Sequence, residues 1–428
     1  MNQYLRILTA AIILVTAMSL TSKAERNWID GVNLASGGSV NLTASEGYIK
    51  TPEGGSIYMW GFGLEGGVMQ YPGPTLIMNQ GATITVNLRN MLPADRVSIV
   101  FPGQSNIAVS SGVAGLLTQE AETNGGTVAY TFTASKPGTY LYHSGTRQDL
   151  QMEMGLFGAL VVRPSVITQA YDHTNTVFDT EYLFLLSEAD PIVHEAIQKG
   201  HPARADMTSF WPVYWFINGR CGTDTMLDAN VSWLPHQPYN CSPMMYPGER
   251  LLLRFVGGGR DLHPFHTHGN NFTIIARDGR LLESQPGLSG PDITESDFTI
   301  AVAPGQTADA TFEWTGYKLG WDIYGHTSTN DPVMPNEYLP DHGKPLPVTL
   351  PNMMDLTFGA HYGGSAFMGS TGMLPPSHAG LNPYGAFMYM WHSHAEKEIC
   401  NNNVFPGGML TMMMVMPPST NMPMMTGH

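Results

Sequence analysis

The stretch His263-Pro264-Phe265-His266-Thr267-His268-Gly269 places three imidazoles within six residues. Successive side chains of a β-strand point to opposite faces, so His266 and His268, two positions apart, are predicted to share one face. Two imidazoles on one face can bind one metal ion or two neighbouring ions. This stretch therefore predicts a strand that carries a metal site.

A second pair of histidines, His392 and His394, directly follows the aromatic run Phe387 to Trp391 and precedes Gly408-Met409. A lone histidine is usually a surface residue or a satisfied core residue. Two pairs with the same spacing, each at the end of a predicted strand, favour a metal site instead. We expect the histidines of the two stretches, His263 included, to converge on one pocket.

Short β-like segments separated by turn residues surround both stretches. The chain holds 47 Gly and 31 Pro in 428 residues, which favours turn-rich β structure over a helical bundle. Alternation of apolar and polar residues predicts half-buried strands at Ala82 to Leu88 and Gly126 to Ala134, and the apolar run Gly155 to Val162 predicts a buried strand. Further strands are predicted at 140–142, 182–186, 215–219, 250–256, 272–276, 298–302, 387–391 and 409–416.

These segments predict an all-β protein with two Greek-key β-sandwich domains, residues 30–165 and 175–418. Asp190 to Gly200 is the one stretch predicted to be helical. Residues 330–386, rich in Pro, Gly and Met, are predicted to be a long insertion in the second domain, and 419–428 a disordered tail.

Composition excludes several partners and frameworks. Twenty Lys and Arg against 35 Asp and Glu give a formal net charge of −15, which argues against nucleic acid or an anionic membrane surface as a partner. Three cysteines allow neither a disulfide framework nor a Cys₄ zinc site. Cys221 and Cys241 are able to form one disulfide, which leaves Cys400 unpaired, or Cys400 replaces one of them.

Residues 1–24 have the pattern of a secretory signal peptide. Arg6 gives a positive start, Ile7 to Leu20 an apolar segment, and Ser22-Lys23-Ala24 a small-residue cleavage site. The alternative is an uncleaved N-terminal anchor. We expect an exported protein, periplasmic or secreted, with no membrane span after cleavage.

The motifs together resemble the multicopper oxidase family, which is built of cupredoxin domains. The matching blocks are Tyr71-Pro72-Gly73-Pro74-Thr75 with Asn79-Gln80-Gly81, Lys136 to Ser144 with Gly155 to Ala159, His263 to Gly269, and Trp391 to His394 with Gly408-Met409. With two predicted domains, the layout resembles two-domain laccases and copper nitrite reductases. The resemblance implies a cupredoxin fold and copper as the cofactor.

The departures from that family concern both of its copper centres. The family builds a blue, type 1 copper from two His, a Cys thiolate and an axial Met, and a trinuclear cluster from four His-x-His pairs. Here the Cys position holds Ser393 and the following His position holds Glu398, so that His263 and Met409 remain. A hydroxyl cannot replace the covalent thiolate bond of a blue site.

Of the cluster histidines, five remain in the chain: His143, His266, His268, His392 and His394. The resemblance implies a mono- or dinuclear copper centre formed by the last four, with His143 joining it from the first domain. Cys400 lies seven residues beyond Ser393, and we assign it a structural role. The spacing His392-x-His394-x₃-Glu398 also occurs in cupin metal sites, an interpretation that the rest of the sequence does not favour.

Methionine is abundant, with 27 residues. Met412 to Met414 fit a strand core, whereas Met353, Met354, Met368 and Met373, near His361 and His378, show no packing period. Thioether sulfur selects Cu(I), so this segment is either a weak Cu(I) site or a plain low-complexity loop.

The sequence thus predicts an exported copper oxidoreductase, remodelled for metal-ion oxidation or one-centre redox chemistry, that is not blue. Its expected partners are a metal ion or a small redox substrate and further copies of itself, with a trimer as in two-domain relatives. The alternative is a non-catalytic copper-binding, electron-transfer or structural component.

Overall fold

The computed structural model describes residues 29–345, 372–373, 381–382 and 386–416, apart from Gly325, Thr327, Pro335 and Asn336. The predicted signal peptide, the predicted tail and most of the predicted insertion lie outside the described residues.

The first half of the chain forms two main sheets and a small hairpin. Its strands are β1 (Val32–Leu34), β2 (Ser39–Lys50), β3 (Ser56–Leu64), β4 (Leu76–Asn79), β5 (Thr83–Asn90), β6 (Ala108–Ser111), β7 (Val113–Ala114), β8 (Gln119–Glu120), β9 (Gly126–Thr133), β10 (Gly138–His143) and β11 (Phe157–Arg163). The sheet orders are β1-β4-β11-β10 and β3-β2-β5-β9-β6, and β7 pairs with β8. In β5 the alternate residues Ile84, Val86 and Leu88 are buried, which is why this alternating segment forms a strand with one face in the core.

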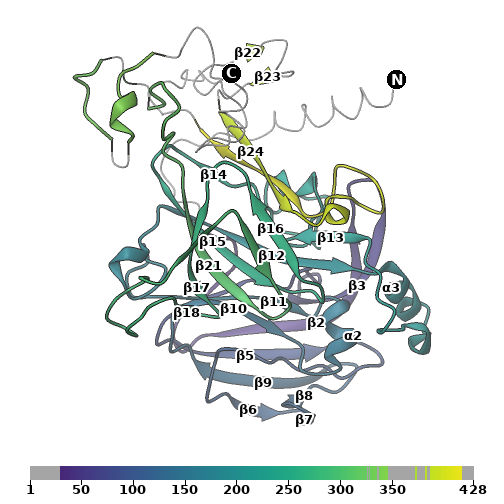
Figure 1. Ribbon diagram of the computed structural model, residues 1–428. Coiled ribbons are helices and arrows are strands. Elements are labelled where there is room, and N and C mark those ends of the chain that lie inside the picture. The colour runs from purple at the N-terminus through teal and green to yellow at the C-terminus, as the bar shows by residue number, and fades with distance from the viewer. Residues whose placement is uncertain are drawn as a thin grey trace, which may run out of the picture.

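The second half also forms two main sheets, one of which carries His263, His266 and His392. Its strands are β12 (Thr180–Ala189), β13 (Tyr214–Ile217), β14 (Met244–Met245), β15 (Arg250–Gly257), β16 (His263–Thr267), β17 (Phe272–Arg277), β18 (Arg280–Leu281), β19 (Glu295–Asp297), β20 (Thr299–Val302), β21 (Thr307–Glu313), β22 (Gly372–Met373), β23 (Leu381–Asn382), β24 (Phe387–Ser393) and β25 (Leu410–Val415). One sheet has the order β13-β12-β15-β21-β17-β18, with β19 beside β17, and the other β14-β25-β24-β16-β20 (Figure 1). Their facing sides enclose a core of Phe, Trp and Leu side chains.

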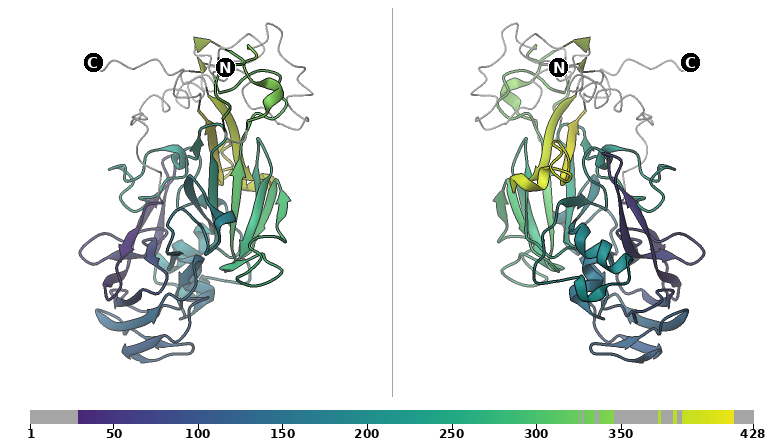
Figure 2. Two further views of the ribbon diagram at one scale, coloured as in Figure 1. Left: turned by 90° about the vertical axis from the view of Figure 1, so that its left-hand side faces the viewer. Right: turned by 90° about the vertical axis from the view of Figure 1, so that its right-hand side faces the viewer.

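The predicted all-β fold is confirmed, and each strand range predicted from the sequence overlaps an observed strand. No main sheet of the described residues takes strands from both halves, which lie side by side in Figure 2. This grouping supports the division at residues 165 and 175, which remains our proposal.

Two α-helices occur in the described residues, where the sequence predicted one. Helix α3 (Pro191–Gln198) is the predicted helix; Asp190 caps it by accepting a hydrogen bond from the Ile192 amide. Helix α2 (Gln148–Glu153) was missed because its first turn has no side-chain cap and follows Arg147, whose φ is 41°. Short 3₁₀ helices are η2 (Thr174–Thr176), η3 (Pro202–Arg204), η4 (Asp224–Met226), η5 (Leu339–Asp341) and η6 (Glu396–Ile399). No helix in the described part of the chain has the length and apolar character needed to cross a bilayer.

The two halves meet through buried polar contacts. Arg254 on β15 donates to Glu181 at 2.7 Å and to Thr139 on β10 at 2.9 Å. Thr139 also donates to Asp309 on β21. These contacts fix β10 against the second half.

All three cysteines are free thiols, so the disulfide considered for Cys221 and Cys241 is absent. The physical reason is that the two thiols are buried in different apolar clusters.

Candidate metal centre

Two neighbouring antiparallel strands, β16 and β24, bring the two histidine pairs together. His266 lies directly opposite His392, and Thr267 opposite Trp391. Opposed residues of antiparallel strands have Cβ atoms about 4.5–5.5 Å apart and share a face. His268 and His394 each lie two positions further along, so all four histidines are on the same side of the sheet.

The imidazoles of His266, His268 and His392 form the compact part of this group, called here the histidine cluster. One ring nitrogen from each lies within 4.8 Å of the others. The two Nε2 atoms of His268 and His392 are 3.4 Å apart. This is the spacing expected of nitrogens that can share one ion.

Hydrogen bonds orient two rings of the histidine cluster and hold the backbone at the third histidine. Nδ1 of His392 donates to the Ser393 carbonyl at 2.7 Å, which leaves the lone pair on Nε2, facing His268. Nδ1 of His266 contacts Thr299 Oγ1 at 2.8 Å. The His268 carbonyl accepts a hydrogen bond from Trp391 Nε1 at 2.8 Å. Partners of this kind fix ring orientation in metal sites.

The cluster is neutral at pH 7. Burial, reinforced by the neighbouring imidazoles, lowers the pKa of His266 and of His268 to about 4. Burial also lowers the pKa of His392. Neutral imidazoles keep the lone pairs that metal ligands require.

His394 lies at the rim of the group. Its ring centroid is 4.9 Å from that of His266, but its side chain is 54% exposed and lies 3.6 Å from the Glu396 carboxylate. The structure therefore brings His394 close to the cluster without including it in the compact set of three.

His143, at the end of β10, is not brought to this group; no contact in the described part of the chain joins them. Its Nδ1 donates to the Ser144 carbonyl at 2.8 Å, the same arrangement that His392 makes with Ser393. Burial lowers the pKa of His143.

His263 faces the other side of β16, because it lies three positions before His266. It is fully buried between two carboxylates: Nδ1 is 2.9 Å from Glu398 Oε2 and Nε2 is 2.8 Å from Glu188 Oε2. Burial by itself lowers the pKa of His263, but the two carboxylates outweigh it and raise the pKa to about 9. His263 is thus a protonated imidazolium at neutral pH, and it does not share a pocket with the histidine cluster, contrary to our expectation from the sequence.

Ser393 and Met409 adjoin this buried triad of Glu188, His263 and Glu398. Ser393 Oγ donates to Glu398 Oε2 at 2.6 Å, and the Met409 amide donates to the Glu398 carbonyl at 2.7 Å. The side chain of Met409 is fully buried in the core. An imidazolium, a hydroxyl and a carboxylate therefore occupy the position where the resemblance would place a thiolate-bound ion.

The donor chemistry decides which ions fit each place. Three neutral imidazole nitrogens suit copper, for which nitrogen sites have the highest affinity among divalent first-row ions. The triad around His263 does not fit a blue copper, because it has no thiolate and both ring nitrogens of His263 are hydrogen bonded. The sequence reasoning missed Glu188, although a Glu inside the apolar run Tyr182 to Ala189 was a signal that it has a buried partner.

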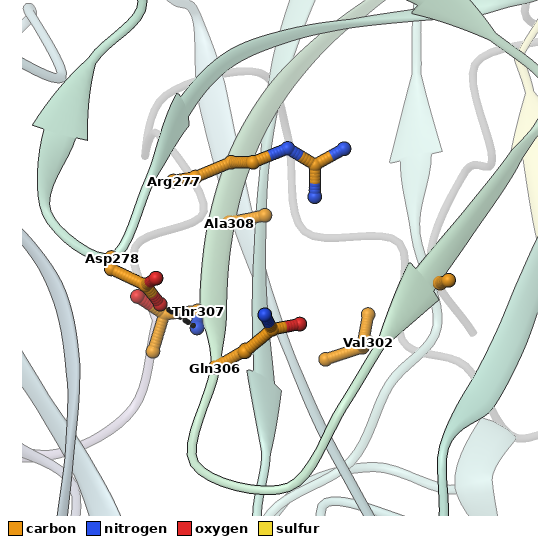
Figure 3. A pocket seen from close by; sticks show the side chains of 7 residues that line it. Arg277, Asp278, Val302, Gln306, Thr307 and Ala308 are labelled. Atoms are coloured by element: carbon orange, nitrogen blue, oxygen red, sulfur yellow. Dashed lines mark hydrogen bonds between the residues drawn. The ribbon is translucent and has the colours of Figure 1, made fainter.

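A small crevice lies elsewhere, where β17 and β21 meet the end of β20 (Figure 3). No histidine or cysteine lines it, and its Asp278 accepts a hydrogen bond from the Thr307 amide at 2.9 Å. It offers no donor set comparable with the histidine cluster.

Comparison with known families gives matches over both halves of the chain. Residues 66–166 match one family model and residues 202–317 match another, and both models are described as multicopper oxidase. Together they cover 217 of the 428 residues.

Curated relatives include copper resistance protein A of Escherichia coli, 27% identical over 306 residues, which are 65% of this chain and 45% of that protein. L-ascorbate oxidase of Cucurbita maxima is 32% identical over 171 residues, 38% of this chain and 28% of that enzyme. The chain thus spans less than half the length of these two relatives.

Two solved structures share the fold. The blue copper oxidase from Nitrosomonas europaea aligns with a TM-score of 0.55 and 18% identity over 88% of this chain and 85% of its own. The multicopper oxidase mgLAC aligns with a TM-score of 0.54 and 17% identity over 93% of this chain and 89% of its own. At these identities the likeness concerns the fold alone.

Proposed function

Because the chain belongs to the multicopper oxidase family, whose cofactor is copper, we propose that it is an exported copper oxidoreductase whose blue site is lost. Copper is held by His266, His268 and His392. The observation that carries this proposal is the convergence of three neutral imidazoles on one face of β16 and β24.

The proposed ligands need little rearrangement to accept an ion. When bound, copper supplies one-electron redox chemistry. The Ser393 carbonyl and Thr299 hold two of the rings by their Nδ1 atoms, and the low pKa of His266 and His268 keeps protons from competing at neutral pH. The half-exposed ring of His394 lies at the rim, where a substrate or a further ligand can approach.

The substrate class that we propose is a reducing metal ion or another small one-electron donor. The buried triad of Glu188, His263 and Glu398 stands in the place of the type 1 copper site, through which electrons enter in the family. The electron donor must therefore approach the histidine cluster itself. A formal charge of −15 attracts cations to the molecule.

Copper content and oxygen consumption test this proposal together. The protein is loaded with Cu²⁺, dialysed, and supplied with Fe²⁺ or Cu⁺, and oxygen uptake is measured above the protein-free rate. We expect copper and uptake in the wild type and in His201→Ala, an exposed-histidine control, and loss of uptake and of one copper ion per chain in His268→Ala/His392→Ala.

Failure to bind copper would overturn the proposal. Bound copper without oxygen uptake, with either donor, would favour the alternative of a non-catalytic copper-binding, electron-transfer or structural component.

A further inference from the structure

A second group of metal-ligating side chains lies outside the histidine cluster, in the segment that follows β21. Asp322, His326, Glu337 and His342 each offer one ligand atom, and these four atoms lie within 4.8 Å of one another. We propose that they bind one divalent transition-metal ion, with Zn²⁺ as the best fit. This proposal does not depend on the copper function, because it uses different residues.

The four side chains surround a small polar centre. His326 Nδ1 lies 2.8 Å from Asp322 Oδ2 and 3.4 Å from Glu337 Oε1, and His342 Nδ1 lies 2.7 Å from the same Glu337 oxygen. Four ligands at the Zn²⁺ bond lengths of about 2.0–2.1 Å are roughly 3.3 Å apart in a tetrahedron. The observed spacings therefore require only small shifts to accept an ion.

The four polar side chains are largely shielded from solvent, although each residue as a whole is only half-buried. The side chains of Asp322, Glu337, His342 and His326 are 1%, 3%, 8% and 11% exposed. Buried carboxylates and imidazoles at this density are stabilised either by pairing or by a metal ion.

Backbone amides hold both carboxylates in place. Asp322 Oδ1 accepts from the Tyr324 amide at 2.8 Å, and Glu337 Oε2 accepts from the Met334 amide at 2.9 Å. In each carboxylate the other oxygen is the one that faces the imidazoles. This is the outer-shell arrangement that orients carboxylate ligands in metal sites.

The backbone on either side of the group is anchored. Trp321 and Ile323 are buried in the core of the second half, and the Asp322 amide donates to the Lys344 carbonyl at 2.9 Å. The segment, drawn in green at the upper left of Figure 1, is thus closed at its base. A bound ion would join its first part, at Asp322 and His326, to its last part, at Glu337 and His342.

The donor set selects the kind of ion. Ca²⁺ and Mg²⁺ prefer six or more oxygen ligands, whereas two of the four donors here are imidazole nitrogens. Two carboxylates also neutralise a divalent charge. Two imidazoles with two carboxylates therefore suit Zn²⁺, with other divalent first-row ions as competitors.

The test uses the full chain with the histidine cluster removed, His268→Ala/His392→Ala, so that Zn²⁺ cannot bind there. This protein is incubated with Zn²⁺, dialysed and analysed for metal, and Co²⁺ is added to a second sample as a spectroscopic probe. We expect one Zn²⁺ per chain and the strong visible bands of four-coordinate Co²⁺. Glu337→Gln and His342→Ala, each added to this background, are expected to weaken Zn²⁺ binding at least tenfold, whereas His201→Ala leaves it unchanged.

The absence of retained Zn²⁺ in the His268→Ala/His392→Ala protein would overturn the proposal, as would equal retention in the Glu337→Gln and His342→Ala variants. If a loop variant fails to fold, the metal content and Co²⁺ spectrum of the background protein decide the matter. Copper binding by a Glu337→Gln chain with an intact histidine cluster shows that this substitution acts locally.

Discussion

At the residue scale, the largest difference from the copper sites of the family is found around His263. Its imidazolium is enclosed by Glu188 and Glu398, and Ser393 donates to the second of these carboxylates. A buried charge without a partner is costly, so the two carboxylates and the imidazolium depend on one another. The triad thus stabilises the folded protein at the position where the family binds copper, but only while His263 is protonated.

Stability is therefore expected to fall as the pH rises from about 6.5 to 9. The pKa of His263 is raised in the folded protein to about 9 from 6.5, so its contribution is complete below pH 6.5 and is lost as the pH passes the folded value. At about 1.4 kcal/mol per pKa unit this is on the order of 3 kcal/mol. Urea unfolding of the metal-free protein between pH 6.5 and 9.5 measures it.

Glu398→Gln provides the comparison for this pH dependence. Removing one carboxylate lowers the folded pKa of His263, so the variant should lose less stability across the same pH range while being less stable at pH 6.5. Identical pH slopes for the variant and the wild type would show that His263 is not the titrating group.

At the element scale, strand β16 separates two kinds of chemistry on its two faces. His263 and Phe265 face the core, and His266, on the opposite face, is part of the histidine cluster. The register with β24 then sets His266 against His392, and the Trp391 indole ties the backbone at His268 to that strand. This side-chain hydrogen bond adds to the backbone pairing of the two strands at the cluster.

Much of this element could be predicted from the sequence. The spacing of His266 and His268 placed them on one face, and the odd spacing of His263 implied the opposite face, although we expected a single pocket. The register with His392 was not predictable, because strand pairing depends on the whole sheet. The partnership of Glu188 with His263, and the meeting of Asp322 with His342, depend on contacts between residues far apart in sequence, which no local pattern specifies.

Trp391→Phe tests whether the indole hydrogen bond positions His268. The phenyl ring keeps the packing against Phe312 but not the bond to the His268 carbonyl, so we expect a loss of about 1 kcal/mol in stability and weaker copper binding. Chelator competition measures the copper affinity. Tyr389→Phe is the control, because Tyr389 lies on the same strand as Trp391 and the substitution removes the hydrogen bond that its hydroxyl accepts from Trp314. Equal copper affinities in the two variants would rule out this role for Trp391.

At the scale of the whole molecule, His143 and the histidine cluster belong to different halves and make no contact with each other in the described residues. Polar contacts through Thr139, Arg254 and Asp309 hold the halves together, so a rigid rearrangement that joins them is unfavourable. We propose that His143 reaches the cluster of a second copy of the chain, as in a homo-oligomer such as a trimer.

Light scattering of the copper-loaded protein tests this assembly. We expect an oligomer, and in His143→Ala a lower copper content per chain or weaker association, because one imidazole ligand is lost at the interface. His201→Ala should behave like the wild type. A stable monomer with a full complement of copper would exclude the assembly.

The central claim is that the histidine cluster holds copper without a thiolate ligand. The EPR spectrum of the protein with one equivalent of Cu²⁺ tests it most directly, recorded together with the visible absorption. We predict ordinary hyperfine splitting with nitrogen ligation, weak absorption, and loss of this signal in His268→Ala/His392→Ala once Zn²⁺ has filled the site of Asp322, His326, Glu337 and His342. An intense blue band that Cys400→Ser abolishes would contradict the claim, since it would show that a thiolate binds the copper.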